Sequence, residues 1–228
     1  MQPGNHAQRL DLCHRVTAHL DVLSLILLTD EASFTRDGIN NLRNTHTWSH
    51  HNPHATCVTH FQRRFSVNVW CGVVGNRLIR PFVFYNNLTG NTYEAFLRHE
   101  IPGLLEDIPL MMSQMYFQHD GAMPHYTRRV RKFLNESFPN RWLGRRGPVA
   151  WPPWSPDLTP LDYYLWGHMK TIVYETKVES RAALHRRIFA AADHIRNHPH
   201  NISSATESLL IRAKNCIATG GGYFEQVL

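Results

Sequence analysis

Residues 22–31, VLSLILLTDE, form the stretch that decides the fold. Residues 22–29 are a nearly continuous apolar run of strand length, which is typical of a strand buried on both faces of a sheet. The run stops at the acidic pair Asp30-Glu31. The sequence therefore predicts a central strand over 22–29 that delivers a carboxylate pair at its end.

A hairpin is predicted downstream of this strand. Residues 65–74 alternate, with Phe65, Val67, Val69 and Cys71 on one face, and a Gly75-Asn76 turn leads into a second strand over 77–85. The polar segment 35–64 before the hairpin, rich in Asn and His, is too long for an ordinary connection between strands. We therefore expect that segment to be either functional or mobile.

The middle of the chain alternates helices with a second acidic strand end. An amphipathic helix is predicted from Thr92, bent or interrupted at Pro102. Residues 115–120, MYFQHD, predict a short strand ending at Asp120, and an amphipathic helix rich in Arg and Lys is expected after Pro124.

The third acid lies at a predicted helix start. Residues 148–151, PVAW, are a candidate short strand. A helix is expected near Leu161, with Thr159 as N-cap and Pro160 as its first residue, so Asp162 falls in the first turn. Two further helices follow. This order predicts an α/β fold of the ribonuclease-H-like kind, a mixed sheet flanked by helices.

Composition narrows the functional classes. The apolar share of 43% predicts a folded globular chain, and no segment approaches the roughly 18 apolar residues of a membrane span. A net charge of +6 modestly favours a polyanionic partner. Cys13, Cys57, Cys71 and Cys216 form no CxxC pair, so we expect reduced thiols rather than a disulfide framework or a thiolate zinc site.

Each of the three acids also has a purely structural explanation. Asp162 could complement the helix dipole and its capping amides, and Asp30 and Asp120 could be strand-end turn residues. Together they could instead hold hard divalent cations, which take oxygen ligands and assist attack at a phosphodiester. Residue types and spacing alone leave both interpretations open.

Four ordered motifs carry a resemblance to a known family. They are LLTDEASFTRDGINNLRNTHTWSHHNPH (27–54), RFSVNVWCGVVGNRLIRPFVF (64–84), QHDGAMPHYTRRVRKFLNE (118–136) and WPPWSPDLTPLDYYLWGHMK (151–170). Together these segments resemble the catalytic domain of mariner-like DNA transposases, and the likeness extends from about Arg9 to the end of the chain. The family's Asp-Asp-Asp triad falls on Asp30, Asp120 and Asp162, whereas Asp157 falls on a structural turn position and Glu31 on a neighbour of the site.

The resemblance implies a function and a domain plan. It implies a nuclear DNA transposase core that uses two Mg²⁺ or Mn²⁺ ions for strand cleavage and strand transfer on transposon ends and target DNA, as a homodimer without membrane association. Residues 1–20 are expected to be a linker and 21–228 the catalytic domain, with 35–64 a clamp-like insertion and no N-terminal helix-turn-helix modules. Histidines of that insertion could suggest zinc, but their spacing matches no closed four-ligand pattern.

A run of cations between the second and third acids is the expected DNA-binding surface. Its alternative is a solvated helix face, although beside a phosphate-binding triad such groups can neutralise DNA backbone charge. The main functional rival is a host-adopted or decayed remnant that binds DNA or dimerises without catalysis, and a second is a nuclease that does not transpose. The expected DNA-binding residues are Arg128, Arg129, Arg131, Lys132, Arg145 and Arg146.

Overall fold

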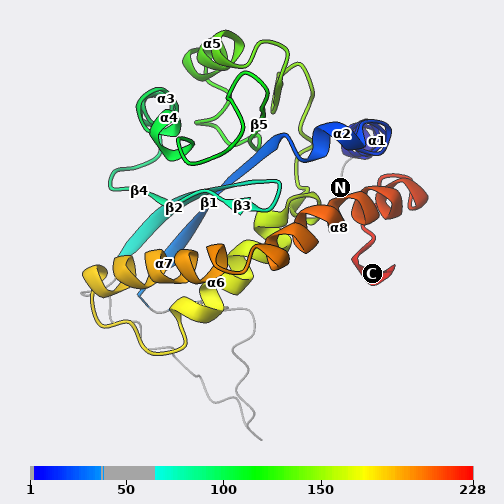
Figure 1. The fold of residues 1–228 in the computed structure, drawn as a ribbon. Helices are drawn as coiled ribbons and strands as arrows, with labels where there is room; N and C mark the ends of the chain where they lie inside the picture. Colours follow the sequence, from blue (N-terminus) through cyan, green and yellow to red (C-terminus); the bar gives the residue numbers. More distant parts are fainter. Residues whose placement is uncertain (1–2, 37, 39–64, 228) are drawn as a thin grey trace, which may run out of the picture.

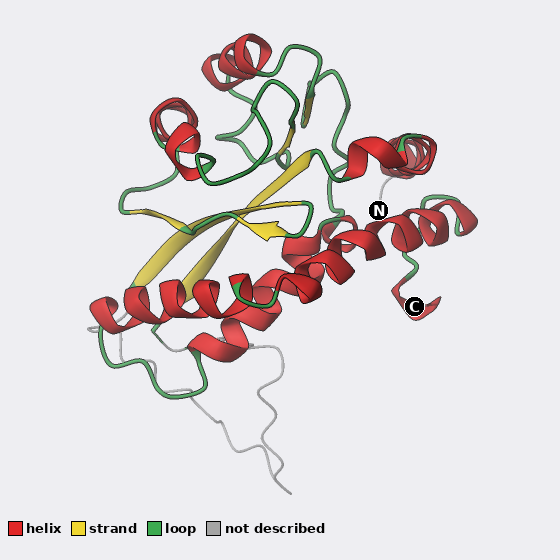
Figure 2. Ribbon diagram, viewed as in Figure 1, coloured by secondary structure: helices red, strands yellow, loops and turns green. Residues whose placement is uncertain are grey.

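A mixed six-stranded sheet lies at the centre of the molecule, with helices on both faces (Figures 1 and 2). The computed structural model describes residues 3–36, 38 and 65–227. Strand order is β3-β2-β1-β5-β6, with β4 paired to β2, and only the β1–β5 and β5–β6 pairs are parallel. The strands are β1 (Ile26–Thr35), β2 (Ser66–Val74), β3 (Arg77–Leu78), β4 (Phe82–Phe84), β5 (Tyr116–Gln118) and β6 (Trp142–Leu143).

The helices form two layers, and each layer buries one face of the sheet. Leu27 packs with α3, α4 and α5 on one face, whereas its neighbour Leu28 packs with α1, α6, α7 and α8 on the other. This division follows from the alternation of side chains along a strand. The helices are α1 (Pro3–Ala18), α2 (Leu20–Leu23), α3 (Gly90–His99), α4 (Ile101–Leu104), α5 (Arg128–Ser137), α6 (Trp166–Val173), α7 (Arg181–Arg196) and α8 (Pro199–Ala218).

The first strand begins and ends later than its apolar run predicts. Residues 20–23 are helical, and β1 continues past the acidic pair to Thr35, so Asp30 lies within the strand and not at its end. The cause is the antiparallel pairing with β2, which extends from Leu28↔Val73 to Thr35↔Ser66. Ala32 and Phe34 are buried while Ser33 is exposed, which is the period of two that marks this extension.

The predicted hairpin is confirmed, but its second strand is divided. Gly75 takes the left-handed backbone that the turn needs, with φ of 55°. β3 and β4 both pair with β2, yet their registers differ by one residue, since Leu78 pairs with Val73 and Phe82 with Trp70. Pro81 lies at this bulge, where a residue without a backbone N–H is tolerated.

Helix α3 begins and ends as its side chains dictate. Thr89 and Thr92 form a capping box at its start. The predicted interruption is also found, because the chain turns at Glu100 into α4, which carries Pro102 in its first turn.

Two further predictions need correction. The strand expected over 148–151 is absent from the described sheet apart from one bridge, Leu143↔Val149, and the neighbour of β5 is β6. After a turn in which the Gly147 N–H bonds to the Gly144 carbonyl, residues 148–151 pair with the end of β6 only through the bonds of Gly144 to Val149 and Trp151. The expected linker 1–20 is largely the helix α1, which packs against α8 (Figure 1).

Two predictions remain, the insertion at 35–64 and the absence of a membrane span. Most of the clamp-like insertion predicted at 35–64 lies outside the described residues. No helix within the described ranges has the length and apolar character needed to cross a bilayer.

Candidate active site

A cleft opens where β5 ends and β1 continues. The parallel pairing stops at Leu28↔Gln118, and there the side chain of Gln118 replaces a strand neighbour by accepting the Thr29 backbone N–H at 3.1 Å. The Thr29 hydroxyl donates to the Gln118 carbonyl at 2.6 Å. Asp30 lies two residues after Leu28, and Asp120 lies two residues after Gln118, so the two acids occupy corresponding positions beyond this last pair.

All three predicted acids line this cleft, which has a volume of about 540 Å³. Asp30 comes from β1, Asp120 follows β5, and Asp162 lies in the helical segment before α6. Arg145 lines the cleft as well. Residues 152–156, called the cleft wall below, line it too.

Asp162 is presented by an unusual helix start. A 3₁₀ turn, Pro156–Leu158, is followed by a π-helical turn, Leu161–Leu165, in which the Trp166 N–H bonds to the carbonyl of Leu161. Thr159 was predicted as the N-cap; its carbonyl accepts the Asp162 N–H at 3.1 Å, and its hydroxyl reaches the Leu161 N–H at 3.4 Å. Single π-turns inside helices are frequent at functional sites because they re-aim side chains.

The Asp30 carboxyl is held in a partly buried, negatively charged setting. Burial and then the charges of Asp162 and Glu31 raise its pKa to about 8, against a hydrogen bond that lowers it. That bond comes from the Trp166 indole N–H, which donates to Asp30 Oδ2 at 2.7 Å. At neutral pH the carboxyl therefore keeps its proton unless a cation offsets the surrounding charge.

His125 connects Asp120 to Glu31. Its Nδ1 lies 2.6 Å from Asp120 Oδ1, and its Nε2 lies 3.1 Å from Glu31 Oε2, close enough for an ion pair although not aligned as a hydrogen bond. Burial lowers the His125 pKa, but the Glu31 charge and these contacts outweigh it and raise the pKa to about 10. The imidazolium and the Ala122 N–H in turn outweigh the burial of Asp120 and lower its pKa.

Asp162 responds mainly to its surroundings in the cleft. Desolvation and the charge of Asp120 raise its pKa to about 6, while Lys170 acts in the opposite direction. Asp30 and Asp162 are thus the two acids with raised pKa values, and each is affected by the charge of another acid of the cleft. Mutual repulsion of this kind is what a bound divalent cation relieves.

The chemistry of the donors fits a hard cation. Three carboxylates from separate elements offer oxygen ligands to one cleft, and Glu31 Oε1 is buried without a hydrogen-bond partner beside them. Among the described residues, however, no three Asp, Glu, His or Cys side chains converge into a ready-made metal site. Ligation by the three acids would therefore require side-chain movement or ligands from a substrate.

The predicted cations fall into two groups. Arg145 lines the cleft, and its guanidinium lies 4.0 Å from the Tyr126 ring centre. Arg146 and the four cations of α5 are not among the lining residues: Arg129 donates to Asn91 at 3.0 Å and Arg131 to the Tyr126 carbonyl at 3.1 Å. Arg128, Arg129, Lys132, Arg145 and Arg146 are exposed, and Arg131 is half-buried.

Two residues of the site were not predicted, namely His125 and Trp166. His125 follows Asp120 by five positions within the quoted motif QHDGAMPH, and that motif was the available signal. Trp166 lies four positions after Asp162, one helical turn on, but nothing in the sequence shows that its indole turns towards β1.

Comparison with known proteins places the fold. No protein-family profile and no curated protein matches the sequence. Among solved structures, the crystal structure of the Mos1 mariner transposase catalytic domain is similar, with a TM-score of 0.72 and 18% identity over 99% of this chain and 98% of that chain. The same catalytic domain with raltegravir and Mn gives a TM-score of 0.73 at 18% identity.

Larger assemblies of the same transposase are also similar. The mariner Mos1 paired-end complex with Mg matches with a TM-score of 0.76 at 19% identity, over 99% of this chain and 65% of that chain. The present chain therefore spans less than two thirds of the transposase in those complexes. The predicted fold class is confirmed: this chain has the ribonuclease-H-like fold of the Mos1 transposase catalytic domain.

Proposed function

We propose that this chain cleaves DNA strands and transfers them to new DNA in a reaction that depends on divalent cations, as the core of a mariner-like transposase. The observation that carries the proposal is the convergence of Asp30, Asp120 and Asp162 on one cleft. Each arises from a different part of the chain, so separate helix-capping or turn roles do not explain why they share it. The neighbouring structures, which are of Mos1 with transposon ends and with Mg or Mn, support DNA and these metals as partners.

Divalent cations held by these oxygens would supply activation of the attacking oxygen and stabilisation of the leaving oxygen. The protein's own groups would set the arrangement. Trp166 orients Asp30, and His125 orients Asp120 while compensating part of the negative charge. Arg145 stands at the same cleft, where its charge can hold a DNA phosphate. We further propose a homodimer acting in the nucleus, since transposon ends must be paired on chromosomal DNA.

Nicking of supercoiled plasmid in Mn²⁺ or Mg²⁺ tests the cleavage step. Asp30→Asn, Asp120→Asn and Asp162→Asn should each reduce nicking by about a hundredfold or more, as expected when one member of a unit is removed. Asp107→Asn, at an exposed carboxylate outside the cleft lining, is the matched control and should nick like the parent.

Joining of duplex oligonucleotides with free 3′-hydroxyl ends to plasmid tests the transfer step. Cleavage without joining would leave a nuclease of the same fold. A folded parent chain that binds DNA but does not cleave it in either metal would instead support the non-catalytic, host-adopted alternative.

A further inference from the structure

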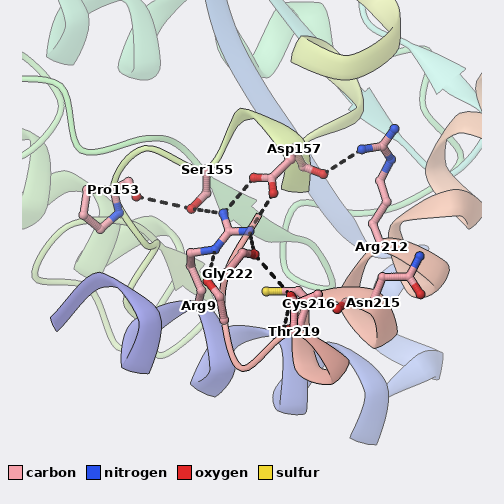
Figure 3. Close-up of polar contacts among 10 residues, drawn as sticks. Arg9, Pro153, Ser155, Asp157, Arg212, Asn215, Cys216, Thr219 and Gly222 are labelled. Atoms are coloured by element: carbon pink, nitrogen blue, oxygen red, sulfur yellow. Dashed lines mark hydrogen bonds and ion pairs between the residues drawn. The ribbon is translucent and has the colours of Figure 1, made fainter. Parts of the chain in front are cut away.

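The side chain of Arg9 in α1 is completely buried, with 0% of its surface exposed. It forms a two-pronged ion pair with Asp157, in which Nη1 donates to Oδ1 at 2.7 Å and Nη2 to Oδ2 at 2.6 Å (Figure 3). The two residues are 148 positions apart, so the pair joins the start of the chain to the segment beside the cleft. A guanidinium fork matches a carboxylate in this way at fixed geometry.

Every N–H of the Arg9 guanidinium has an acceptor. Besides Asp157, Nη1 donates to Ser155 Oγ at 2.9 Å, Nε to the Gly221 carbonyl at 2.9 Å and Nη2 to the Gly222 carbonyl at 3.3 Å. Gly221 has φ of 84°, and a Cβ there would lie 2.5 Å from the His6 carbonyl oxygen. The C-terminal turn therefore approaches α1 closely at a position that only glycine fits.

Two of the partners of Arg9, Ser155 and Asp157, belong to the cleft or adjoin it. Ser155 lines the cleft as part of the cleft wall, and Asp157 directly follows that wall. Arg212 from α8 also donates to the Asp157 carbonyl at 3.1 Å, so the segment is held from both terminal helices (Figure 3). Asp162 lies five residues beyond Asp157, after the 3₁₀ and π turns that these bonds anchor.

Stability alone does not explain such a pair. Removing two charges from water costs several kcal/mol per ion, and apolar residues of similar volume often replace a buried ion pair without loss of stability. What the pair adds over apolar contacts is direction, because three directional bonds fix Ser155 of the wall and Asp157 in the turn after it, and two more tie Arg9 to the C-terminal turn. Because the pair lies beside the cleft, fixing these residues also affects the position of Asp162.

We propose that Arg9 is a positioning residue: through Ser155 and Asp157 it fixes the cleft wall and thereby the place of Asp162 opposite Asp30 and Asp120. The consequence for catalysis rests on the function proposed above, whereas the anchoring of the wall does not. It follows that α1 belongs to the catalytic unit and is not a linker before it.

The double variant Arg9→Met/Asp157→Leu tests this role, because it keeps apolar volume and leaves no unpaired charge. The control is Arg98→Met/Glu94→Leu, the same change at an ion pair of α3 outside the cleft lining. We expect the Arg9 variant to fold with kcat for Mn²⁺-dependent plasmid nicking at least about tenfold lower, at unchanged KM, as misplacement of a reacting group predicts. Hydrogen–deuterium exchange should rise in residues 150–162 and not in the strands.

The outcomes separate this proposal from the proposed function. A kcat and an exchange pattern equal to those of the control would overturn it, and so would a rise in KM alone, which would indicate lost DNA binding. If the parent chain does not nick DNA, the proposed function fails, but the exchange experiment still decides whether Arg9 fixes the wall. If the double variant does not fold, Arg9→Lys, which keeps the charge and loses the fork, replaces it; unchanged kcat and exchange there would refute the proposal.

Discussion

The indole of Trp166 donates a 2.7 Å hydrogen bond to Asp30 Oδ2 and thereby connects the start of α6 to the middle of β1. The donor is buried, and its ring also meets Phe34 edge-on at 6.2 Å between centroids. One side chain thus combines core packing with orientation of a cleft carboxylate.

Trp166→Phe should therefore lower the free energy of unfolding by about 1–2 kcal/mol, since a partly buried carboxyl loses its donor. It should also weaken Mn²⁺ binding, because Asp30 is no longer oriented. Urea denaturation and calorimetry measure the two effects. Trp70→Phe is the control, because the buried Trp70 indole N–H has no partner to lose. Equal weakening of Mn²⁺ binding in both variants would contradict the orienting role.

Metal-free stability should depend on pH through Asp30. Its folded pKa, about 8, lies above the unfolded value, so the folded state holds this proton more tightly than the unfolded state. The stability contributed by that proton is complete below about pH 4 and is lost as the pH rises to about 8. Asp30→Asn cannot undergo this loss. In EDTA the stability of the Asp30→Asn variant should therefore increase relative to that of the parent as the pH rises.

Thermal unfolding across that pH range measures the difference. By pH 8 we expect a Tm advantage of at least about 2–4 °C, the shift that 1 kcal/mol produces in a chain of this size. Asp107→Asn should show no such trend. A constant difference between Asp30→Asn and the parent at all pH values would mean that the Asp30 pKa is not raised.

Local sequence patterns predicted which elements form better than they predicted the residues at which those elements begin and end. The apolar run before Asp30 identified the central strand, yet β1 is displaced towards the C-terminus because pairing with β2 outweighs local hydrophobicity. The Gly75-Asn76 turn was predictable because its backbone requirement is local. The one-residue bulge near Pro81 and the short strand β6 depend on partners distant in sequence, which no local pattern contains.

The cleft shows the same division. The acids were found because their motifs are contiguous words in the chain. Arg9 could not be found in this way, since its partners lie 146 to 213 positions away and its own neighbourhood has the composition of an ordinary surface helix. Tertiary contacts decide whether an arginine is buried. For this reason the sequence alone did not show that the segment expected to be a linker packs against the rest of the domain.

DNA binding should weaken with salt in proportion to the phosphates contacted. Removing one phosphate-contacting cation reduces the slope of log affinity against log salt by about 0.9 for duplex DNA. Arg145→Ala, at the cleft, and Arg128→Ala, on α5, should each produce this change. Arg186→Ala is the control, because Arg186 is also exposed but lies on α7, on the face of the sheet opposite to α5. Fluorescence anisotropy with a labelled duplex gives the slopes. Identical slopes for all three variants would show that Arg145 and Arg128 do not contact DNA phosphates.

Trp154, at the cleft wall, has the left-handed backbone conformation, with φ of 57°, and 78% of its surface is exposed. A non-glycine residue in this region costs about 1 kcal/mol or more, and a β-branched residue costs further. Trp154→Gly should therefore leave the free energy of unfolding unchanged or raise it by up to about 1 kcal/mol, whereas Trp154→Val should lower it.

Asn140→Gly, at a similar φ of 59° outside the cleft lining, provides the matched control for the backbone effect. Urea denaturation of the three variants measures the backbone strain, and plasmid nicking measures whether the Trp154 side chain contributes to activity. A glycine variant that is as stable as the parent but nicks DNA more slowly would show that the exposed indole contacts the substrate, because the backbone requirement alone is met equally well by glycine. If Trp154→Val is as stable as Trp154→Gly, the left-handed conformation is not imposed by the fold, and the strain assigned to this wall position is wrong.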